Sequence, residues 1–231
     1  MKLVVFTPAV KTSAIGRMAT LVVQALAAQG HQVVVVRTED ISHLEAPIHA
    51  FGVEVVRWDD TNRVGALTRT ADLVVYQIGN SFQFHRGCLE WLPTLPGVVC
   101  LHDYFLGGLF WSWATPANRV LAQAILQAWY GEAIAANFFN HRCSKDFIEA
   151  TWNKAPMTEW IASMATGVIT HSSWDIERIV KQWKKHKPIS EIAKYFGVTR
   201  QWVHQIVNRY TRSGTIPVLH KPGRRTKDIT E

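Results

Sequence analysis

The fold of the N-terminal part is decided by residues 2–36, which read KLVVFTPAVKTSAIGRMATLVVQALAAQGHQVVVV. Leu3–Phe6 is wholly apolar and His31–Val36 ends in four valines, as expected for strands buried on both faces of a parallel sheet. Between them, apolar residues recur at helical spacing over 18–26, and Gly30 is suited to end that helix in the left-handed conformation. The stretch therefore predicts two parallel strands joined by a helix.

The same alternation continues to about residue 170. Further strands are expected at Val53–Trp58, Ala71–Ile78, Gly97–Leu101 and Val168–Thr170. Helical patterns run over about Pro116–Phe147 and Met157–Ala165. Apolar strands that alternate with helices predict an α/β fold, a doubly wound and mostly parallel Rossmann-like sheet with helices on its faces.

Charge divides the chain into two parts. Residues 1–178 hold 13 Lys and Arg against 15 Asp and Glu, a balance of −2. Residues 179–231 hold 12 against 3, a balance of +9. We therefore expect a Rossmann-like domain at 1–175, a small helical module at 176–213 and a basic extended tail at 214–231. Such a basic segment favours a polyanionic partner.

Composition excludes several classes of protein. With 48% hydrophobic residues the chain is not disordered as a whole. No apolar run reaches the roughly 18 to 20 residues of a membrane span, and the N-terminus lacks a signal-peptide core. Cys88, Cys100 and Cys143 fit no metal-ligand spacing, so free thiols and no metal site are expected. These features predict a cytoplasmic protein.

Ligands of open α/β sheets bind outside the carboxyl ends of the strands. The residues that follow the first, fourth, fifth and sixth expected strands are therefore the candidates for a binding site: Gly16 and Arg17, Gly79 and Asn80, His102 and Asp103, and His171 and Ser172. The first loop has neither a G-x-G-x-x-G nor a P-loop pattern. Its N–H groups and Arg17 at a helix start still favour an anion such as phosphate, the alternative being an ordinary turn.

Three stretches at these strands carry a family resemblance. They are ADLVVYQIGN at 71–80, LPGVVCLHD at 95–103 and TGVITHSSW at 166–174, and GHQV at 30–33 fits the same pattern. Over about residues 1–176 the chain resembles the N-terminal, acceptor-side half of GT-B glycosyltransferases, the retaining group often called family 4. That resemblance implies a nucleotide-sugar donor rather than a tightly bound cofactor, and a sugar or glycolipid acceptor.

The resemblance also assigns roles to individual residues. Gly16 and His102 would line the cleft of the enzyme, with His102 and Asp103 as candidate catalytic residues. Acceptor contacts would come from the pairs Gly79–Asn80 and His171–Ser172. The alternatives are that His102 caps a loop and that Asp103 caps a helix. Because no donor-binding domain is recognisable after the sixth strand, we expect little or no transferase activity from this chain alone. A separate donor-domain chain would then be a possible partner.

The basic part has the spacing of a helix-turn-helix. Two short helices that cross steeply need a small residue at their contact, here Ala193, and a turn residue with positive φ four positions later, here Gly197. Ser190 and Thr199 are suited to N-cap the two helices. The apolar face of the second helix is formed by Trp202, Val203, Ile206 and Val207. The alternative is a helical hairpin without a DNA partner.

A helix-turn-helix places its second helix in the major groove of duplex DNA. The candidate base-reading residues are then Thr199, Arg200, Gln201, His204 and Gln205. The candidate phosphate contacts are Lys187, Lys194, Asn208 and Arg209. Lys221, Arg224 and Arg225 form a basic strip that suits an A·T-rich minor groove, unless it is only a solvated tail.

This part of the chain carries a second resemblance. ISEIAKYFGVT at 189–199, RYTRSGTIP at 209–217 and KPGRR at 221–225 resemble the N-terminal DNA-binding region of insertion-sequence transposases and integrases. In that family the module finds the ends of the element, and a separate acidic core cuts DNA.

Three interpretations remain open. In the first, the chain is a DNA-binding protein of regulator or transposase type, and its N-terminal domain is a sugar- or nucleotide-binding sensor or a non-functional remnant. In the second, the chain is one half of an enzyme and needs another chain. In the third, it is a truncated or chimeric glycosyltransferase-like protein that carries a DNA-binding module. The junction near Arg178 has no Pro, Gly or Ser linker, which favours the chimera.

Overall fold

The computed structural model describes residues 1–114, 116–152, 154–171, 174–196 and 200–213. The chain divides into two compact units, Met1–His171 and Ser172–Glu231. Each unit is described by itself below.

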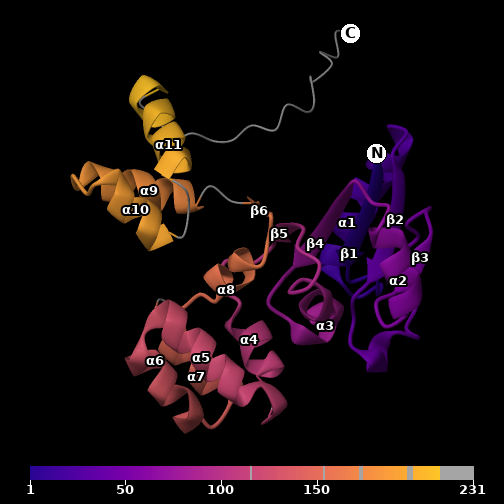
Figure 1. The fold of residues 1–231 in the computed structure, drawn as a ribbon, viewed down its shortest axis with the longest axis horizontal. Coiled ribbons are helices and arrows are strands. Elements are labelled where there is room, and N and C mark those ends of the chain that lie inside the picture. The colour runs from indigo at the N-terminus through magenta and orange to yellow at the C-terminus, as the bar shows by residue number, and fades with distance from the viewer. Residues whose placement is uncertain (115, 153, 172–173, 197–199, 214–231) are drawn as a thin grey trace, which may run out of the picture. The chain divides into compact units, whose positions relative to one another are not determined.

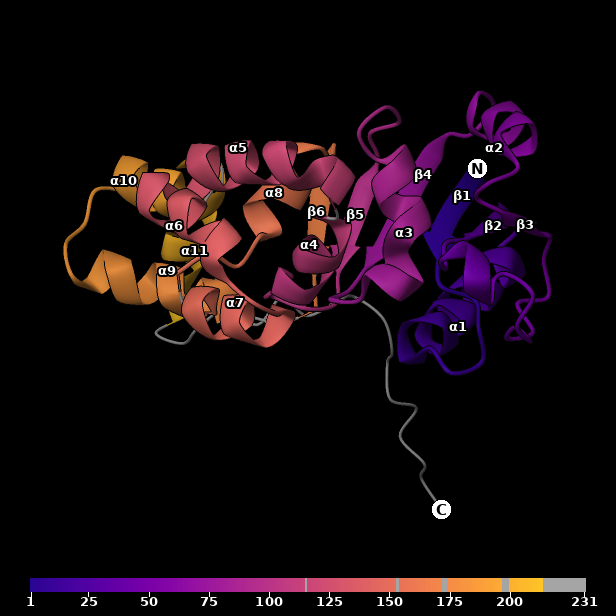
Figure 2. The same cartoon turned by 90° about the horizontal axis from the view of Figure 1, so that it is seen from below.

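The first unit is built on a six-stranded parallel sheet. Its strands are β1 (Lys2–Thr7), β2 (Gln32–Arg37), β3 (Val55–Arg57), β4 (Leu73–Ile78), β5 (Val98–Leu101) and β6 (Gly167–Thr170). Their order is β3-β2-β1-β4-β5-β6, and Figure 2 shows them side by side in this order. Val4 pairs with Val34 on one side and Val74 on the other. The predicted doubly wound parallel fold is confirmed, with the order of strands reversing between β1 and β4.

The two faces of this sheet are covered unequally (Figure 1). On one face α1 (Ala14–Ala28) packs on side chains of β1 and β2, among them Leu3 and Val35. On the other face lie α2 (Thr61–Thr68) and α3 (Phe82–Trp91). A further group of helices shares the apolar cluster of that face and extends beyond the sheet (Figure 1). It consists of α4 (Gly107–Trp113), α5 (Arg119–Tyr130), α6 (Glu132–Asn137), α7 (Ser144–Thr151) and α8 (Thr158–Ser163). Short 3-10 turns lie at η1 (Ile41–His43), η2 (Pro116–Asn118) and η3 (Phe138–Asn140).

The long helical region expected at 116–147 is broken. Gly131 adopts φ +87° between α5 and α6, a conformation that ends a helix and that glycine adopts at low cost. The layer is held by aromatic rings around the fully buried Phe110, which contacts Phe138, Phe147 and Trp160. The Trp113 and Trp160 ring centroids lie 4.6 Å apart. Aromatic rings therefore pack these helices together, as the outer part of the apolar cluster that they share with the sheet.

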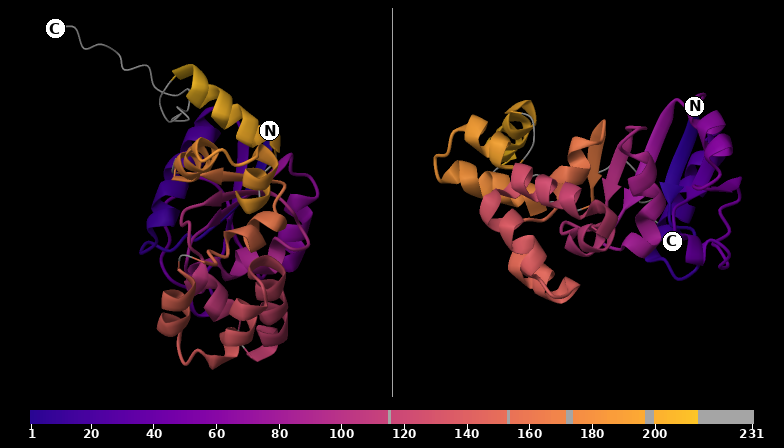
Figure 3. Two further views of the ribbon diagram at one scale, coloured as in Figure 1. Left: turned by 90° about the vertical axis from the view of Figure 1, so that its left-hand side faces the viewer. Right: turned by 60° about the horizontal axis from the view of Figure 1, so that its bottom comes forward.

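The second unit contains three helices, α9 (Trp174–Lys184), α10 (Ile189–Phe196) and α11 (Arg200–Ser213), coloured orange to yellow in Figure 3. They bury a separate apolar cluster, which consists of Ile179, Val180, Ile192, Ala193, Val203, Ile206 and Val207. Ala193 is among these buried residues, as expected for the point where the two short helices cross. The helical module expected after the sheet is present.

The ends of α9 and α10 are defined by backbone hydrogen bonds. His186 has φ +59°. Its N–H donates to the carbonyl of Trp183 at 2.8 Å, and the N–H of Lys187 donates to the carbonyl of Gln182 at 3.4 Å. This pattern is a Schellman motif with histidine in the place usually taken by glycine. The prediction that Ser190 N-caps α10 is wrong, because the N–H groups of residues 191 and 192 bind the carbonyl of Pro188, which leaves Ser190 inside the helix.

Candidate functional sites

Two glycines allow close packing at the switch point between β1 and β4. A Cβ atom on Gly16, in the first turn of α1, would lie 2.4 Å from the carbonyl oxygen of Pro8. One on Gly79, directly after β4, would lie 2.6 Å from Ile15 and 2.9 Å from a carboxylate oxygen of Asp103. The segments that follow β1, β4 and β5 therefore meet here, as the position of the candidate residues predicted.

The loop after β1 already holds an anion, the carboxylate of Glu39. This side chain is fully buried and accepts hydrogen bonds from the N–H groups of Ala9 (2.7 Å) and Val10, while Arg37 pairs with it at 3.2 Å. In the first turn of α1, the N–H group of Gly16 is bound by the Ser13 hydroxyl at 3.0 Å. A phosphate could reach the N–H groups of Ala9 and Val10 only by displacing Glu39.

His102 is held in a defined orientation after β5. Its Nε2 donates a hydrogen bond to the side-chain oxygen of Gln77 at 2.6 Å, and its ring lies 4.6 Å from that of His171. Burial, reinforced by His171 and opposed by Asp103, lowers the pKa of His102 to about 4. The imidazole is thus neutral at pH 7 and its Nδ1 carries a lone pair, which can accept a hydrogen bond from a ligand hydroxyl.

A second histidine, His85 of α3, lies beneath this site. Its Nε2 accepts the N–H of Gly79 at 3.1 Å, which places the ring proton on Nδ1. Complete burial, and next the proximity of His102, lower the pKa of His85 to about 3. His85 therefore fixes the Gly79 backbone as a neutral side chain.

Asp103 and Asn80 connect the neighbouring loops. A carboxylate oxygen of Asp103 accepts the N–H of Asn80 at 2.8 Å. The side-chain oxygen of Asn80 accepts the N–H groups of Gly108 (2.8 Å) and Leu109 (3.0 Å), so Asn80 caps the start of α4. Both residues orient the loops that surround His102.

The structure thus brings together most of the residues predicted for this edge. Gly16, Gly79, Asn80, His102, Asp103 and His171 form one continuous group, Arg17 is exposed on the first turn of α1, and Ser172 lies outside the described residues. Three further residues of this group, Gln77, His85 and Glu39, were not predicted from the sequence. A glutamine inside the apolar strand LVVYQI was a signal for the first, and an acidic residue just after the second strand for the last.

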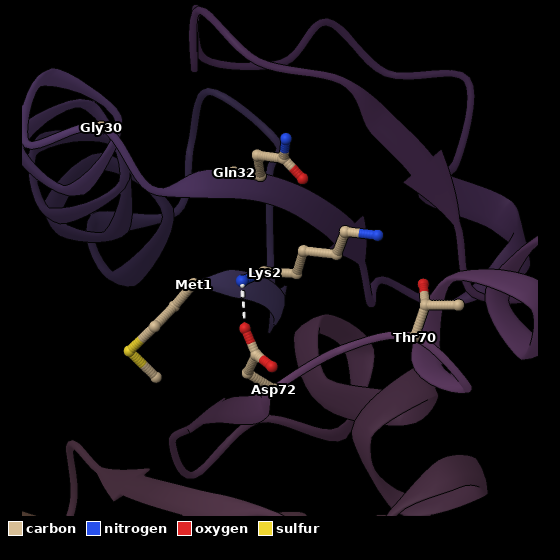
Figure 4. A pocket seen from close by; sticks show the side chains of 6 residues that line it. All are labelled: Met1, Lys2, Gly30, Gln32, Thr70 and Asp72. Carbon is tan, nitrogen blue, oxygen red and sulfur yellow. Dashed lines mark hydrogen bonds between the residues drawn. The ribbon is translucent and has the colours of Figure 1, made fainter.

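An open hollow lies at the opposite, amino-terminal edge of the strands. In Figure 4 the carboxylate of Asp72 accepts the backbone N–H of Lys2 at 2.7 Å. The lining residues are Met1, Lys2, Gly30, Gln32, Thr70 and Asp72. None of them belongs to the predicted site, and ligands of open α/β sheets bind at the other edge. In the described part of the chain, no group of three or more His, Cys, Asp or Glu side chains could hold a metal ion.

The second unit presents a polar stripe on α11. Val203, Ile206 and Val207 face the apolar cluster of this unit and are buried. Arg200, His204 and Asn208, each one turn after the last, are exposed. We call these three residues the outer stripe of α11. Other residues predicted to contact DNA have positions or side chains outside the described part of the structure, namely Thr199, Gln201, Gln205, Arg209, Lys221, Arg224 and Arg225.

Some basic side chains of this unit are engaged within it. Lys187 pairs with Glu191 at 2.9 Å, Arg178 lies over the ring of Phe196 and Lys184 over that of Tyr210. Other basic side chains are exposed, among them Lys181, Lys185, Lys194 and Arg212. The exposed charge of the described residues in this unit is therefore largely positive.

Comparison with known proteins finds a similarity in this part of the chain. Residues 173–219, which include all three helices, match the family model of a homeodomain-like domain. No curated protein and no solved structure matches the chain. The helix-turn-helix predicted from the sequence is thus supported by an independent family match. In addition, no helix within the described ranges has the length and apolar character needed to cross a membrane.

Proposed function

We propose that the second unit binds duplex DNA, with the N-terminal half of α11 in the major groove. The observation that carries this proposal is the match of residues 173–219 to a homeodomain-like domain, whose helices here enclose a buried apolar core. In helix-turn-helix proteins the helix that follows the turn contacts base edges, and α11 holds that place.

The outer stripe of α11 supplies chemistry suited to this role. Arg200 is at the start of the helix and can donate two hydrogen bonds to guanine. His204 and Asn208 follow at one-turn intervals on the same exposed side. Lys194, exposed on α10, suits a phosphate oxygen, which positions the protein without reading the sequence. Lys187 is a weaker candidate because Glu191 competes for it.

The proposal is tested by titrating the full chain into fluorescently labelled duplex DNA and measuring anisotropy at several salt concentrations. We expect the logarithm of the affinity to fall linearly with the logarithm of salt concentration, with a slope of about −0.9 for each phosphate neutralised. Binding that is absent at low salt, or independent of salt, would refute the proposal.

The resemblance of this module to transposase DNA-binding regions supports a finer proposal, that the preferred target is a repeat at the end of a mobile element. Selection of bound sequences from a random duplex library tests it. A recovered consensus should coincide with inverted repeats near the gene, whereas the absence of any consensus would leave only non-specific binding.

We propose as a second function that the carboxyl edge of the sheet binds a hydroxyl-rich ligand such as a sugar or a nucleotide. The oriented, neutral imidazole of His102 supports this proposal, because Nδ1 can accept a hydroxyl proton next to loops fixed by Asn80 and Asp103. The resemblance to glycosyltransferases suggests the ligand class. The described residues form a single sheet, so we expect binding without transfer.

Calorimetric titration with nucleotide sugars and with their free sugars tests this second function. We expect binding that is weakened at least tenfold in His102→Ala. It should be unchanged in His31→Ala, a control at the amino-terminal ends of the strands. Equal affinity in both variants would place the ligand elsewhere. Release of nucleoside diphosphate by the chain alone would contradict the expectation of binding without transfer.

The chimeric origin of the chain remains part of the same proposal. The last residue of β6 is Thr170 and the first of α9 is Trp174, so the two patterns follow each other almost without a connecting segment. Sequencing the surroundings of the gene tests this origin. A transposase core or a donor-domain reading frame immediately downstream would support the chimeric origin. The absence of both would favour an evolved two-part protein.

A further inference from the structure

The two outermost strands of the sheet, β3 and β6, differ in how their open sides are protected. At one edge, β3 ends at Arg57, which pairs with Glu45 and with Asp59, so charged side chains accompany this edge. At the other edge, β6 reads GVIT and has neither charge nor proline. Val168 and Ile169 are 41% and 43% exposed. Natural proteins usually protect an exposed edge with charge, proline or a bulge, and β6 has none of these.

The backbone of β6 offers hydrogen bonds at this edge. The N–H of Thr166, just before the strand, is donated to the carbonyl of Gly97 at 2.9 Å. Because successive residues of a strand direct these groups to alternate sides, the N–H and C=O groups of Gly167 and Ile169 point away from β5. Among the described residues no strand lies beyond β6. The edge can therefore accept one further strand.

We propose that this edge binds the same edge of a second copy of the chain, with the two β6 strands antiparallel about a two-fold axis. The edge is self-complementary, since each strand offers the same outward donors and acceptors, and isologous two-fold pairing is the commonest form of assembly. The apolar side chains of residues 168 and 169, on opposite faces of the sheet, would each gain cross-strand neighbours in the same step. Pairing would join two six-stranded sheets into one continuous sheet.

The register of the edge favours this occupant. In an antiparallel pair centred on Val168, Gly167 of each copy would lie opposite Ile169 of the other, so that the outward N–H and C=O groups of both residues find partners. The two copies of Val168 would face each other at the two-fold axis, and β6 brings no like charges together there.

The test is the mass of the full chain in solution without DNA, measured by light scattering after size exclusion. We expect the wild-type protein at twice 26.1 kDa. Ile169→Lys places a charge on the edge, and Ile169→Pro removes only an N–H that points away from β5, so both should halve the mass. Val22→Lys, which changes an apolar residue of α1 with the same 41% exposure as Val168, should leave the mass doubled.

Circular dichroism and thermal unfolding keep this test independent of misfolding. The Ile169→Pro monomer should retain the spectrum of the wild type, because the hydrogen bonds to β5 are unchanged. A wild-type protein that is monomeric at its highest concentration overturns the proposal. So does a dimer that persists in both Ile169 variants, which would place the interface elsewhere. The absence of DNA binding would refute the proposed function and leave this result intact.

Discussion

At the scale of single residues, Glu39 shows how one buried carboxylate organises a loop. It accepts the N–H groups of Ala9 and Val10 and pairs with Arg37, which in turn donates to the carbonyl of Leu44 at 2.6 Å. The acid occupies the place after the second strand where a dinucleotide-binding protein holds the ribose. Here the carboxylate of Glu39 binds groups of the protein itself, the N–H groups of Ala9 and Val10 and the Arg37 guanidinium.

We expect Glu39→Ala to lower the free energy of unfolding by about 3 to 5 kcal/mol, because it leaves a buried guanidinium and two N–H groups without their acceptor. Urea denaturation measures this loss. Glu45→Ala is the matched control, since it removes a glutamate that is 85% exposed and pairs with Arg57, and should cost at most about 1 kcal/mol. Similar losses in the two variants would contradict the role assigned to Glu39.

His85 predicts how stability depends on pH. Its pKa is lowered to about 3, below the ordinary 6.5, so the unfolded chain binds the proton more readily than the folded chain. Stability is therefore complete above pH 6.5 and falls as the pH decreases toward 3, by about 2 kcal/mol at pH 5. In His85→Gln, whose amide oxygen can still accept the Gly79 N–H, denaturation at pH 7 and pH 5 should show a smaller difference. An unchanged difference would contradict this origin.

Single residues also mark the limit of prediction from sequence. Gly16, Gly79, His102 and Asp103 could be located because each follows a recognisable strand. His85 could not, because a histidine in a weak helical pattern gives no sign that its ring will lie under a glycine of another loop. Such contacts are set by tertiary packing rather than by local sequence.

At the scale of elements, α9 ends in a Schellman motif with His186 at φ +59°. We expect His186→Gly to raise the free energy of unfolding of the second unit by up to about 1 kcal/mol, because glycine adopts this conformation without the left-handed cost. The greater freedom of glycine in the unfolded chain offsets part of the gain.

Thermal unfolding followed by circular dichroism measures this change. His204→Gly places the same substitution inside α11, where it should lower stability by roughly 0.5 kcal/mol. Opposite signs in the two histidine variants are the expected result, and a loss in both would contradict the effect of the left-handed position.

The outer stripe of α11 leads to a prediction on DNA binding. If Arg200 contacts a base as proposed, Arg200→Ala should weaken binding to the preferred duplex by about 1 to 3 kcal/mol, because two hydrogen bonds to guanine are removed. Lys145→Ala removes an exposed charge from the first unit and should change affinity by less than twofold. Anisotropy titration at fixed salt measures both, and equal effects would show that only overall charge matters.

The strands of the sheet could be predicted from the sequence more accurately than the helices. The strands β1, β2, β4 and β5 were predicted almost to the residue, since apolar runs bounded by glycine or polar residues leave few alternatives. The helices α2, α3 and α4 were missed. They contain glycine, and α3 buries His85, Gly87 and Cys88 against the sheet, so packing rather than helix propensity stabilises them.

At the scale of the whole molecule, charge and fold divide at nearly the same place. The chain separates into units at residues 171 and 172, and the excess of basic residues lies after residue 178. Each unit has its own apolar core. The overall class of the fold and the presence of two parts therefore followed from periodicity and charge, whereas the break of the helical layer at Gly131 did not.

We expect a fragment of residues 172–231 to bind DNA with the salt dependence of the full chain, because it holds nearly all of the excess positive charge. A fragment of residues 1–171 should show no such binding. Anisotropy measurements on the two fragments and the full chain test this division. A much weaker affinity of the C-terminal fragment would mean that the first unit contributes contacts or brings two modules together.

The close tryptophan rings of the helical layer have a spectroscopic consequence. Trp113 and Trp160, with centroids 4.6 Å apart, are near enough for their electronic transitions to couple. Coupled indoles give a circular dichroism couplet that neither helix nor strand produces. Loss of this couplet on heating would therefore report the separation of these two rings. The protein thus carries a natural optical probe for the packing of α4 against α8.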